Sequence, residues 1–109
     1  MAEIRVLYIE DIADQREEMA GQLASRDFAV TVAESGESGV AVFQPGAFDL
    51  ILCDLNMPGM DGLAVLKEIR EHCPMTPFIL LTAHATLAKA IEAVKLGAQD
   101  FVYKPVDLD

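Results

Sequence analysis

Apolar residues gather in five short runs along the chain, and polar or turn-forming residues bound each run. Continuous apolar runs of this length are typical of strands that are buried on both faces of a sheet. The predicted strands are residues 4–9, 28–33, 49–54, 78–82 and 100–103. The run 49–54 is the most informative, because it ends in a carboxylate, Asp54, and a loop with Pro58 and Gly59 follows at once.

Segments with helical spacing of apolar residues lie between these strands. The predicted helices are residues 12–26, 36–44, 62–73 and 87–96. Asp61 and Thr86 are suitable N-caps for the last two, and Pro74 and Gly97 end them. Inward-facing apolar positions are expected in every helix, namely Ile12, Met19 and Leu23; Val40 and Phe43; Leu63, Leu66 and Ile69; and Leu87, Ala90, Ile91 and Val94.

Strand and helix alternate from the first element to the last, without repeats, low-complexity tracts or internal linkers. This order is typical of an α/β fold with a parallel sheet and right-handed crossovers. At 109 residues the chain is expected to form one domain, residues 1–109. Its polar strand-end residues fall at the carboxyl ends of the strands, the edge at which open α/β sheets bind ligands.

Composition narrows the possible functions. The net charge is −10, from 18 acidic and 8 basic residues, which argues against binding of a nucleic acid by this domain. No apolar run approaches the roughly 20 residues of a membrane span, and residues 1–5 lack the form of a signal peptide. We therefore expect a cytoplasmic location without membrane contact. Cys53 and Cys73 have no CxxC spacing, so neither a disulfide nor a metal site is expected there.

Five chemically distinctive residues stand at the ends of four predicted strands. They are Glu10, Asp11, Asp54, Thr82 and Lys104. If the strand order is 2-1-3-4-5, the first and third strands are neighbours about 4.8 Å apart, and the three carboxylates share one pocket. Like charges this close raise one another's pKa or require a cation. Mg²⁺ fits, because it binds carboxylates and water and keeps positions for phosphate oxygens.

The opposite wall of this pocket is expected to be positive. The fifth strand lies about 10 Å from the third, so Lys104 reaches a phosphoryl group on Asp54, and Thr82 supplies a hydroxyl donor between them. In this arrangement Asp54 is the nucleophile that forms an aspartyl phosphate, while the cation, Lys104 and Thr82 stabilise the charge of the transferring oxygens. Each residue alone has an ordinary explanation, such as a cap or a solvated charge, but the combination is specific.

The sequence resembles the receiver domain of two-component response regulators over all 109 residues. The motifs that carry this resemblance are the acidic pair 10–11, the phosphoacceptor segment 53–62, the hydroxyl position in 81–83 and the lysine motif 103–105. The resemblance implies a flavodoxin-like, doubly wound sheet of five parallel strands, and the strand order 2-1-3-4-5 is taken from it.

Position by position, the resemblance implies a module of phosphorelay signal transduction rather than an enzyme that acts on a separate substrate. Asp54 would accept a phosphoryl group from the phosphohistidine of a sensor histidine kinase or a phosphotransfer protein. Asp11, Asp54 and the main-chain carbonyl of Asn56 would bind Mg²⁺, with Glu10 acting mainly through water. The same likeness implies a cis bond between Lys104 and Pro105.

The resemblance also implies a switch formed by Thr82 and Tyr103. When the phosphoryl group draws Thr82 toward it, Tyr103 turns inward and the surface of the fourth helix and fifth strand changes shape. This surface would control an output domain that lies C-terminal to residue 109, and pairing of two copies is a further expectation. Asn56 and His84 flank the expected phosphoryl position and are expected to influence its lifetime.

One departure from the family pattern concerns the end of the chain. Members of the family carry a fifth helix after the lysine and proline, whereas only residues 106–109 follow here. Parallel sheets need both faces covered. We therefore expect that the chain is part of a longer protein, or that the uncovered face pairs with another molecule.

Three other functions compete with this interpretation. A flavin-binding electron carrier would need a phosphate-cradling loop where Glu10 and Asp11 would repel a flavin phosphate. A Mg²⁺-dependent phosphatase with an aspartate nucleophile would carry a second aspartate where this chain has Asn56. A degenerate receiver acting only as a protein-binding module is opposed by the intact set of acids, hydroxyl and lysine.

Overall fold

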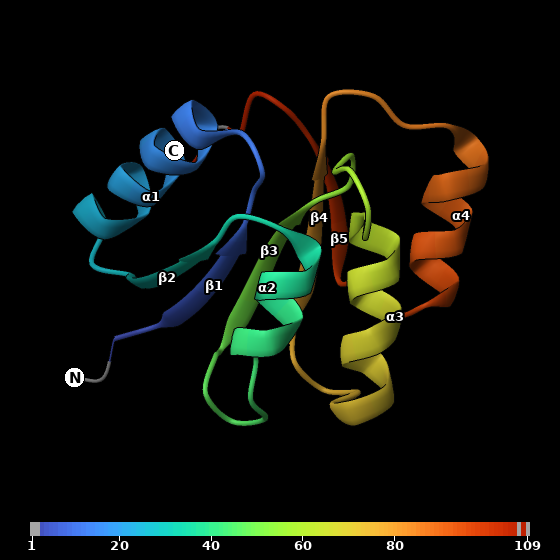
Figure 1. The fold of residues 1–109 in the computed structure, drawn as a ribbon, viewed down its shortest axis with the longest axis horizontal. Helices are drawn as coiled ribbons and strands as arrows, with labels where there is room; N and C mark the ends of the chain where they lie inside the picture. The colour runs from blue at the N-terminus through green and yellow to red at the C-terminus, as the bar shows by residue number, and fades with distance from the viewer. Residues whose placement is uncertain (1–2, 107, 109) are drawn as a thin grey trace.

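The computed structural model describes residues 3–106 and 108, and these form five strands and four helices (Figure 1). The strands are β1 (Arg5–Ile9), β2 (Ala29–Ala33), β3 (Leu50–Asp54), β4 (Phe78–Thr82) and β5 (Asp100–Tyr103). The helices are α1 (Ala13–Ser25), α2 (Gly36–Val42), α3 (Gly62–His72) and α4 (Leu87–Lys95). Every predicted element is therefore confirmed, with ends that differ by at most two residues. Residues 107 and 109 of the predicted remainder 106–109 lie outside the described residues.

All five strands are parallel, and their order is β2-β1-β3-β4-β5, which confirms the predicted fold class. Ile9 pairs with Cys53, so the residues that follow them, Glu10 and Asp54, emerge side by side at the carboxyl edge. Thr82 pairs with Tyr103 at the same edge. The sheet thus brings the ends of β1, β3, β4 and β5 together, and the β1–β3 junction is the point where the strand order reverses.

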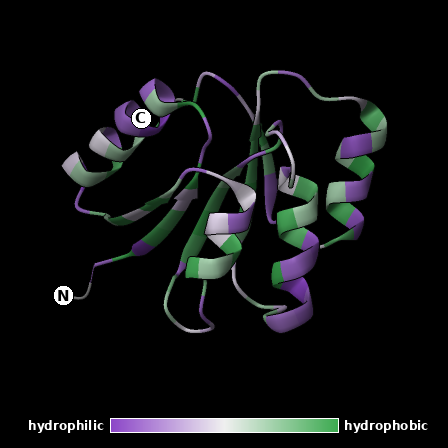
Figure 2. Cartoon of the chain, in the orientation of Figure 1, coloured by the Kyte–Doolittle hydropathy of each residue, from purple (hydrophilic) through white to green (hydrophobic). Residues whose placement is uncertain are grey.

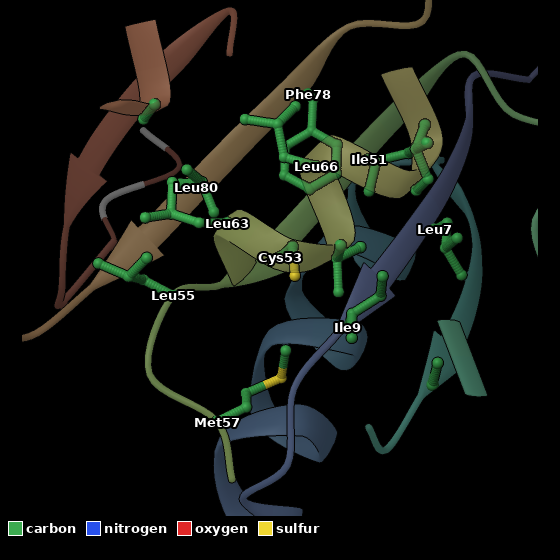
Figure 3. Packing of buried hydrophobic residues seen from close by; sticks show 14 residues of the cluster. Leu7, Ile9, Ile51, Cys53, Leu55, Met57, Leu63, Leu66, Phe78 and Leu80 are labelled. Atoms are coloured by element: carbon green, nitrogen blue, oxygen red, sulfur yellow. The ribbon is translucent and has the colours of Figure 1, made fainter. Parts of the chain in front are cut away.

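Helices cover both faces of the sheet, and the larger core lies on the face covered by α2, α3 and α4 (Figure 1). The strands are mostly hydrophobic, whereas the helices alternate between hydrophobic and hydrophilic positions (Figure 2). The predicted inward residues Leu63, Leu66 and Ile69 of α3 are buried in this core, and Val40 and Phe43 pack against it. Figure 3 shows the packing of this cluster, which holds strand β3 from one side.

A second, smaller cluster lies on the face covered by α1. Its buried members are Val6, Tyr8, Leu23, Leu52 and Leu81, and Met19 of α1 packs against them together with Val106 and Leu108. A cavity of about 440 Å³ opens between α1 and the segment that follows β5, lined partly by Gln15 and Lys104. Within the described part of the chain, no helix is both long and apolar enough to cross a bilayer.

Four predicted inward positions are wrong, three of them in α4. Leu87 and Val94 of α4 are 77% and 72% exposed, and Ile91 lies exposed on the same face. The helix instead packs through Ala93, which is fully buried, because α4 lies near the edge of the sheet and makes its main contacts with α3 and the short strand β5. Ile12 is also exposed, since it caps α1 rather than belonging to its inner face.

The turns around the site follow the predicted caps. The side chain of Asp61 accepts a hydrogen bond from the backbone N–H of Ala64 at 2.9 Å, and Thr86 accepts one from Lys89 at 3.2 Å. Gly97 ends α4 with a φ of +89°, a conformation that glycine adopts without strain. The bond between Lys104 and Pro105 is cis, as the family resemblance implied.

We predict opposite effects of alanine at two glycines. A Cβ atom at Gly62 would lie 2.6 Å from the backbone oxygen of Asp54 and 2.8 Å from the Cα of Leu55, whereas Gly21 in α1 has open space. Gly62→Ala should therefore lower the free energy of unfolding by about 1–3 kcal/mol, and Gly21→Ala should raise it by about 0.5–1 kcal/mol. Urea unfolding of the two variants tests this prediction. The same change in the free energy of unfolding for both variants would show that the chain accommodates a Cβ atom at Gly62 without destabilisation.

Candidate functional site

Three carboxylates meet at the carboxyl edge of the sheet. Glu10 and Asp11 follow β1, Asp54 ends β3, and each offers an oxygen within 4.8 Å of the other two. Glu10 is fully buried and Asp54 is 3% exposed. Buried carboxylates are stable only when cations or hydrogen-bond donors compensate them, so the partners of each group decide what this site can do.

The ammonium group of Lys104 compensates two of the three acids. Its Nζ lies 2.7 Å from Oε1 of Glu10 and 3.3 Å from Oδ1 of Asp54, and it donates a further hydrogen bond of 2.7 Å to Oε1 of Gln15. Burial alone would lower the pKa of Lys104, but the hydrogen bond to Glu10 and the charges of Asp54 and Glu10 raise it overall. Lys104 therefore stays charged and links β5 to the ends of β1 and β3.

Asp11 is the carboxylate that remains uncompensated. Its Oδ1 atom is buried and has no hydrogen-bond partner. Burial and the neighbouring carboxyl of Glu10 raise the pKa of Asp11, against smaller opposing effects of its own backbone N–H and of the charge of Lys104. An unpaired, buried carboxylate oxygen beside two further acids has the donor chemistry of a Mg²⁺ site, because this ion takes oxygen ligands and keeps bound water.

Glu10 is held by groups that the sequence did not single out. The hydroxyl of Tyr8 donates to its Oε1 at 3.4 Å, and the backbone N–H of Ile12 donates to its Oε2 at 3.2 Å. Arg16 donates to the carbonyl of Glu10 at 2.9 Å. Burial, followed by the charge of Glu10, raises the pKa of Tyr8, so the phenol remains a donor. The signal for Tyr8 was present in the sequence, because residues two apart on a strand share a face.

Thr82 lies at the end of β4 with its hydroxyl fully engaged. The hydroxyl accepts hydrogen bonds from Nδ2 of Asn56 at 2.9 Å and from the backbone N–H of His84 at 3.0 Å, and donates to the carbonyl of His84. Nδ2 of Asn56 donates to that carbonyl as well, at 3.0 Å. Asn56 thus ties the loop after β3 to the loop after β4, and its main-chain carbonyl remains a predicted magnesium ligand.

Tyr103 points away from the core. Its side chain is 59% exposed, and its ring meets that of Phe101 edge to face, with centroids 6.1 Å apart. The register places Tyr103 opposite Thr82, on the strand next to it. The structure therefore brings together Glu10, Asp11, Asp54 and Lys104 in one pocket, and sets Thr82 and Asn56 beside it, with Tyr103 outside.

Comparison with known proteins agrees with this geometry. Residues 6–109 match the sequence model of a family described as "Response regulator receiver domain". The chain belongs to this family. A receiver domain is the phosphoacceptor signalling module of a two-component response regulator, and not an enzyme in the usual sense.

The relatives of this receiver domain include regulatory proteins of bacteria. The regulatory protein AtoC of Escherichia coli is 39% identical over 105 residues, and the DNA-binding transcriptional regulator NtrC of Salmonella typhimurium is 38% identical over 104. These matches cover 96% and 95% of this chain but only 23% and 22% of the relatives. The chain therefore spans about a quarter of the length of these proteins.

Solved structures show the same fold. The chemotaxis protein CheY4 of Vibrio cholerae superposes with a TM-score of 0.91 at 30% identity, covering 97% of this chain and 90% of that one. The non-phosphorylated HemR receiver domain of Leptospira biflexa superposes with a TM-score of 0.91 at 29% identity, and the match covers 97% of this chain and 86% of that one. The five-stranded architecture of the receiver domain is thus shared in full by these neighbours.

Neutralising Asp11 is expected to stabilise the receiver domain when divalent cations are absent. Because its raised pKa means that the charged form is disfavoured in the fold, Asp11→Asn should raise the free energy of unfolding at pH 7, by no more than about 0.5 kcal/mol once screening by solvent is taken into account. The gain should shrink as the pH falls, since wild-type Asp11 then becomes neutral as well. Urea unfolding in a chelator measures both effects.

Asp14→Asn is the matched control for this prediction. Asp14 is an exposed acid in the first turn of α1, where the helix dipole favours a negative charge. Its loss should leave the stability unchanged or lower it by up to about 0.5 kcal/mol. A destabilised Asp11→Asn variant would show that Asp11 is not repelled in the folded chain.

Proposed function

We propose that this receiver domain accepts a phosphoryl group on Asp54 in a Mg²⁺-dependent reaction and thereby changes the surface formed by α4 and β5. The donor is the phosphohistidine of a sensor histidine kinase or a phosphotransfer protein. The observation that carries the proposal is the position of Lys104, whose ammonium spans Glu10 and Asp54 beside the unpaired oxygen of Asp11.

Asp54 is suited to be the nucleophile. It ends β3 at the edge of the sheet, and of the two acids that Lys104 contacts it is the one at the longer distance, 3.3 Å. In the transfer, a carboxylate oxygen of Asp54 forms the new O–P bond while the N–P bond of the phosphohistidine breaks, and the leaving imidazole takes up a proton. Lys104 donates to an oxygen of the incoming group in place of its contact with Asp54.

The magnesium ion would be held by Asp11, Asp54 and the main-chain carbonyl of Asn56, with Glu10 acting mainly through water. Oxygen donors and an uncompensated negative charge support this assignment. When bound, the ion supplies positive charge to the oxygens of the phosphoryl group. Glu10 is already held by Lys104 and the backbone N–H of Ile12, which supports a secondary role for it.

The switch begins at Thr82. Its hydroxyl hydrogen is donated to the carbonyl of His84, so it must leave this carbonyl before it can donate to a phosphoryl oxygen. Its movement draws the loop that leads into α4 and leaves space into which Tyr103 turns. The phosphoryl group thereby favours one of two packings of the α4–β5 surface, where Leu87 and Val94 are exposed.

The output lies outside this domain. The relatives are about four times as long as their match to this chain, which supports an output domain C-terminal to residue 109. With a net charge of −10, the receiver domain itself is not suited to bind nucleic acid.

Phosphorylation is tested by intact mass after incubation with Mg²⁺ and a small acyl phosphate. The wild-type chain should gain one phosphoryl group, Asp54→Asn should gain none, and a chelator should abolish the gain. Asp49→Asn, at the other end of β3 in a surface ion pair with Arg5, is the control that should still be modified. A wild-type chain that gains no mass under these conditions would favour a degenerate, protein-binding receiver.

The switch is tested by tyrosine fluorescence. The chain has no tryptophan and two tyrosines, of which Tyr8 is buried and Tyr103 exposed, so quenching by acrylamide reports on Tyr103. Phosphorylation should reduce this quenching in the wild type and in Thr82→Ser. Thr82→Val, which lacks the hydroxyl, should accept the phosphoryl group and remain as quenched as before. Equal quenching before and after phosphorylation of the wild type would contradict the inward turn.

A further inference from the structure

The surroundings of Lys104 contain a residue to which neither the motifs nor the proposed function assigns a role. Its ammonium group has three hydrogens and three acceptors: Oε1 of Glu10 at 2.7 Å, Oε1 of Gln15 at 2.7 Å and Oδ1 of Asp54 at 3.3 Å. The two short contacts lie on the side of β1 and α1. The long contact is the one to the phosphoacceptor.

We propose that Gln15 is a positioning residue for phosphoryl transfer. Its side-chain oxygen takes one N–H of Lys104, Glu10 takes a second, and the third is left directed at Asp54. This inference rests on the proposed function, because it concerns how the same ammonium group meets the incoming phosphoryl oxygen. Gln15 contacts Lys104 and does not touch the phosphoacceptor in the structure, so it acts through the lysine.

The location of Gln15 is fixed by the start of α1. Gln15 belongs to the first turn of this helix, directly before Arg16, whose guanidinium donates to the carbonyls of Glu10 at 2.9 Å and Asp11 at 3.5 Å. Arg16 therefore ties the acidic loop to the turn of α1 that carries Gln15. The side-chain oxygen of Gln15 gives the ammonium an acceptor that is not one of the three acids of the pocket.

Loss of this acceptor has a defined consequence. Lys104 has 17% side-chain exposure and already contacts Asp54, so water and the oxygens of Asp54 compete for the N–H that Gln15 no longer accepts. Because a charged acceptor attracts the ammonium more strongly than water does, Lys104 should close on Asp54. A tighter ion pair occupies the carboxylate oxygens that the reaction needs, so phosphorylation slows.

The test compares Gln15→Met, which keeps the length of the side chain without its acceptor, with Gln15→Glu, which keeps an acceptor oxygen. With Mg²⁺ and a small acyl phosphate, Gln15→Met should be phosphorylated about threefold to tenfold more slowly, with unchanged half-saturation by the donor. Gln15→Glu should retain the wild-type rate within about twofold. Gln22→Met, in the same helix but bonded to Glu18 instead of Lys104, is the control and should match the wild type.

A second measurement needs neither magnesium nor phosphate. The chain has four lysines, so the ¹³C–¹H resonance of the Lys104 Cε can be assigned with Lys104→Arg and followed in each variant. Gln15→Met should shift this resonance, whereas Gln22→Met should leave it unchanged.

Either of two results would overturn the role of Gln15: wild-type rate and resonance in Gln15→Met, or a Gln15→Glu variant as slow as Gln15→Met. A wild-type chain that accepts no phosphoryl group would refute the proposed function instead, and the Lys104 resonance would still decide whether Gln15 positions the lysine.

Discussion

The structure of the site depends on the pairing of one ammonium group with two buried carboxylates. Glu10 and Asp54 have side chains that are 0% and 4% exposed, and both contact Lys104. Removing carboxylates from water is costly unless a cation compensates them. Lys104 and Glu10 are 94 positions apart in the chain, so this pairing forms only when β5 and β1 have taken their places in the sheet. The chemistry of the site is therefore linked to completion of the fold.

The negative charges of the three acids are compensated to different degrees. Glu10 accepts hydrogen bonds from Tyr8, Ile12 and Lys104. Asp11 keeps a buried oxygen without a partner, and Asp54 has only the longer contact with Lys104. Negative charge thus remains at Asp11 and Asp54, the two acids whose side chains we propose to bind the magnesium ion directly.

The same edge of the sheet connects the pocket to the surface that we expect to change. Thr82 is tied to Asn56 and to the loop that leads into α4, and Tyr103 lies on the neighbouring strand. Helix α4 is held to the core mainly by small side chains such as Ala93, while Leu87 and Val94 remain exposed. An element with few buried contacts can shift at low free-energy cost, so the helix nearest to the switch is also the one best suited to move.

The sequence by itself determined the α/β architecture and the acids, hydroxyl and lysine of the site, because apolar runs mark strands and a polar residue at the end of such a run must lie at the edge of the sheet. The strand order came from the family resemblance. Only the tertiary structure decided that the apolar face of α4, with Leu87 and Val94, points to solvent. The spacing of apolar residues shows that a helix has an apolar face, but not which part of the fold that face meets. The tertiary structure also decided that Gln15 and Asn56 reach Lys104 and Thr82, because such contacts join segments distant in the chain, and local patterns carry no information about them.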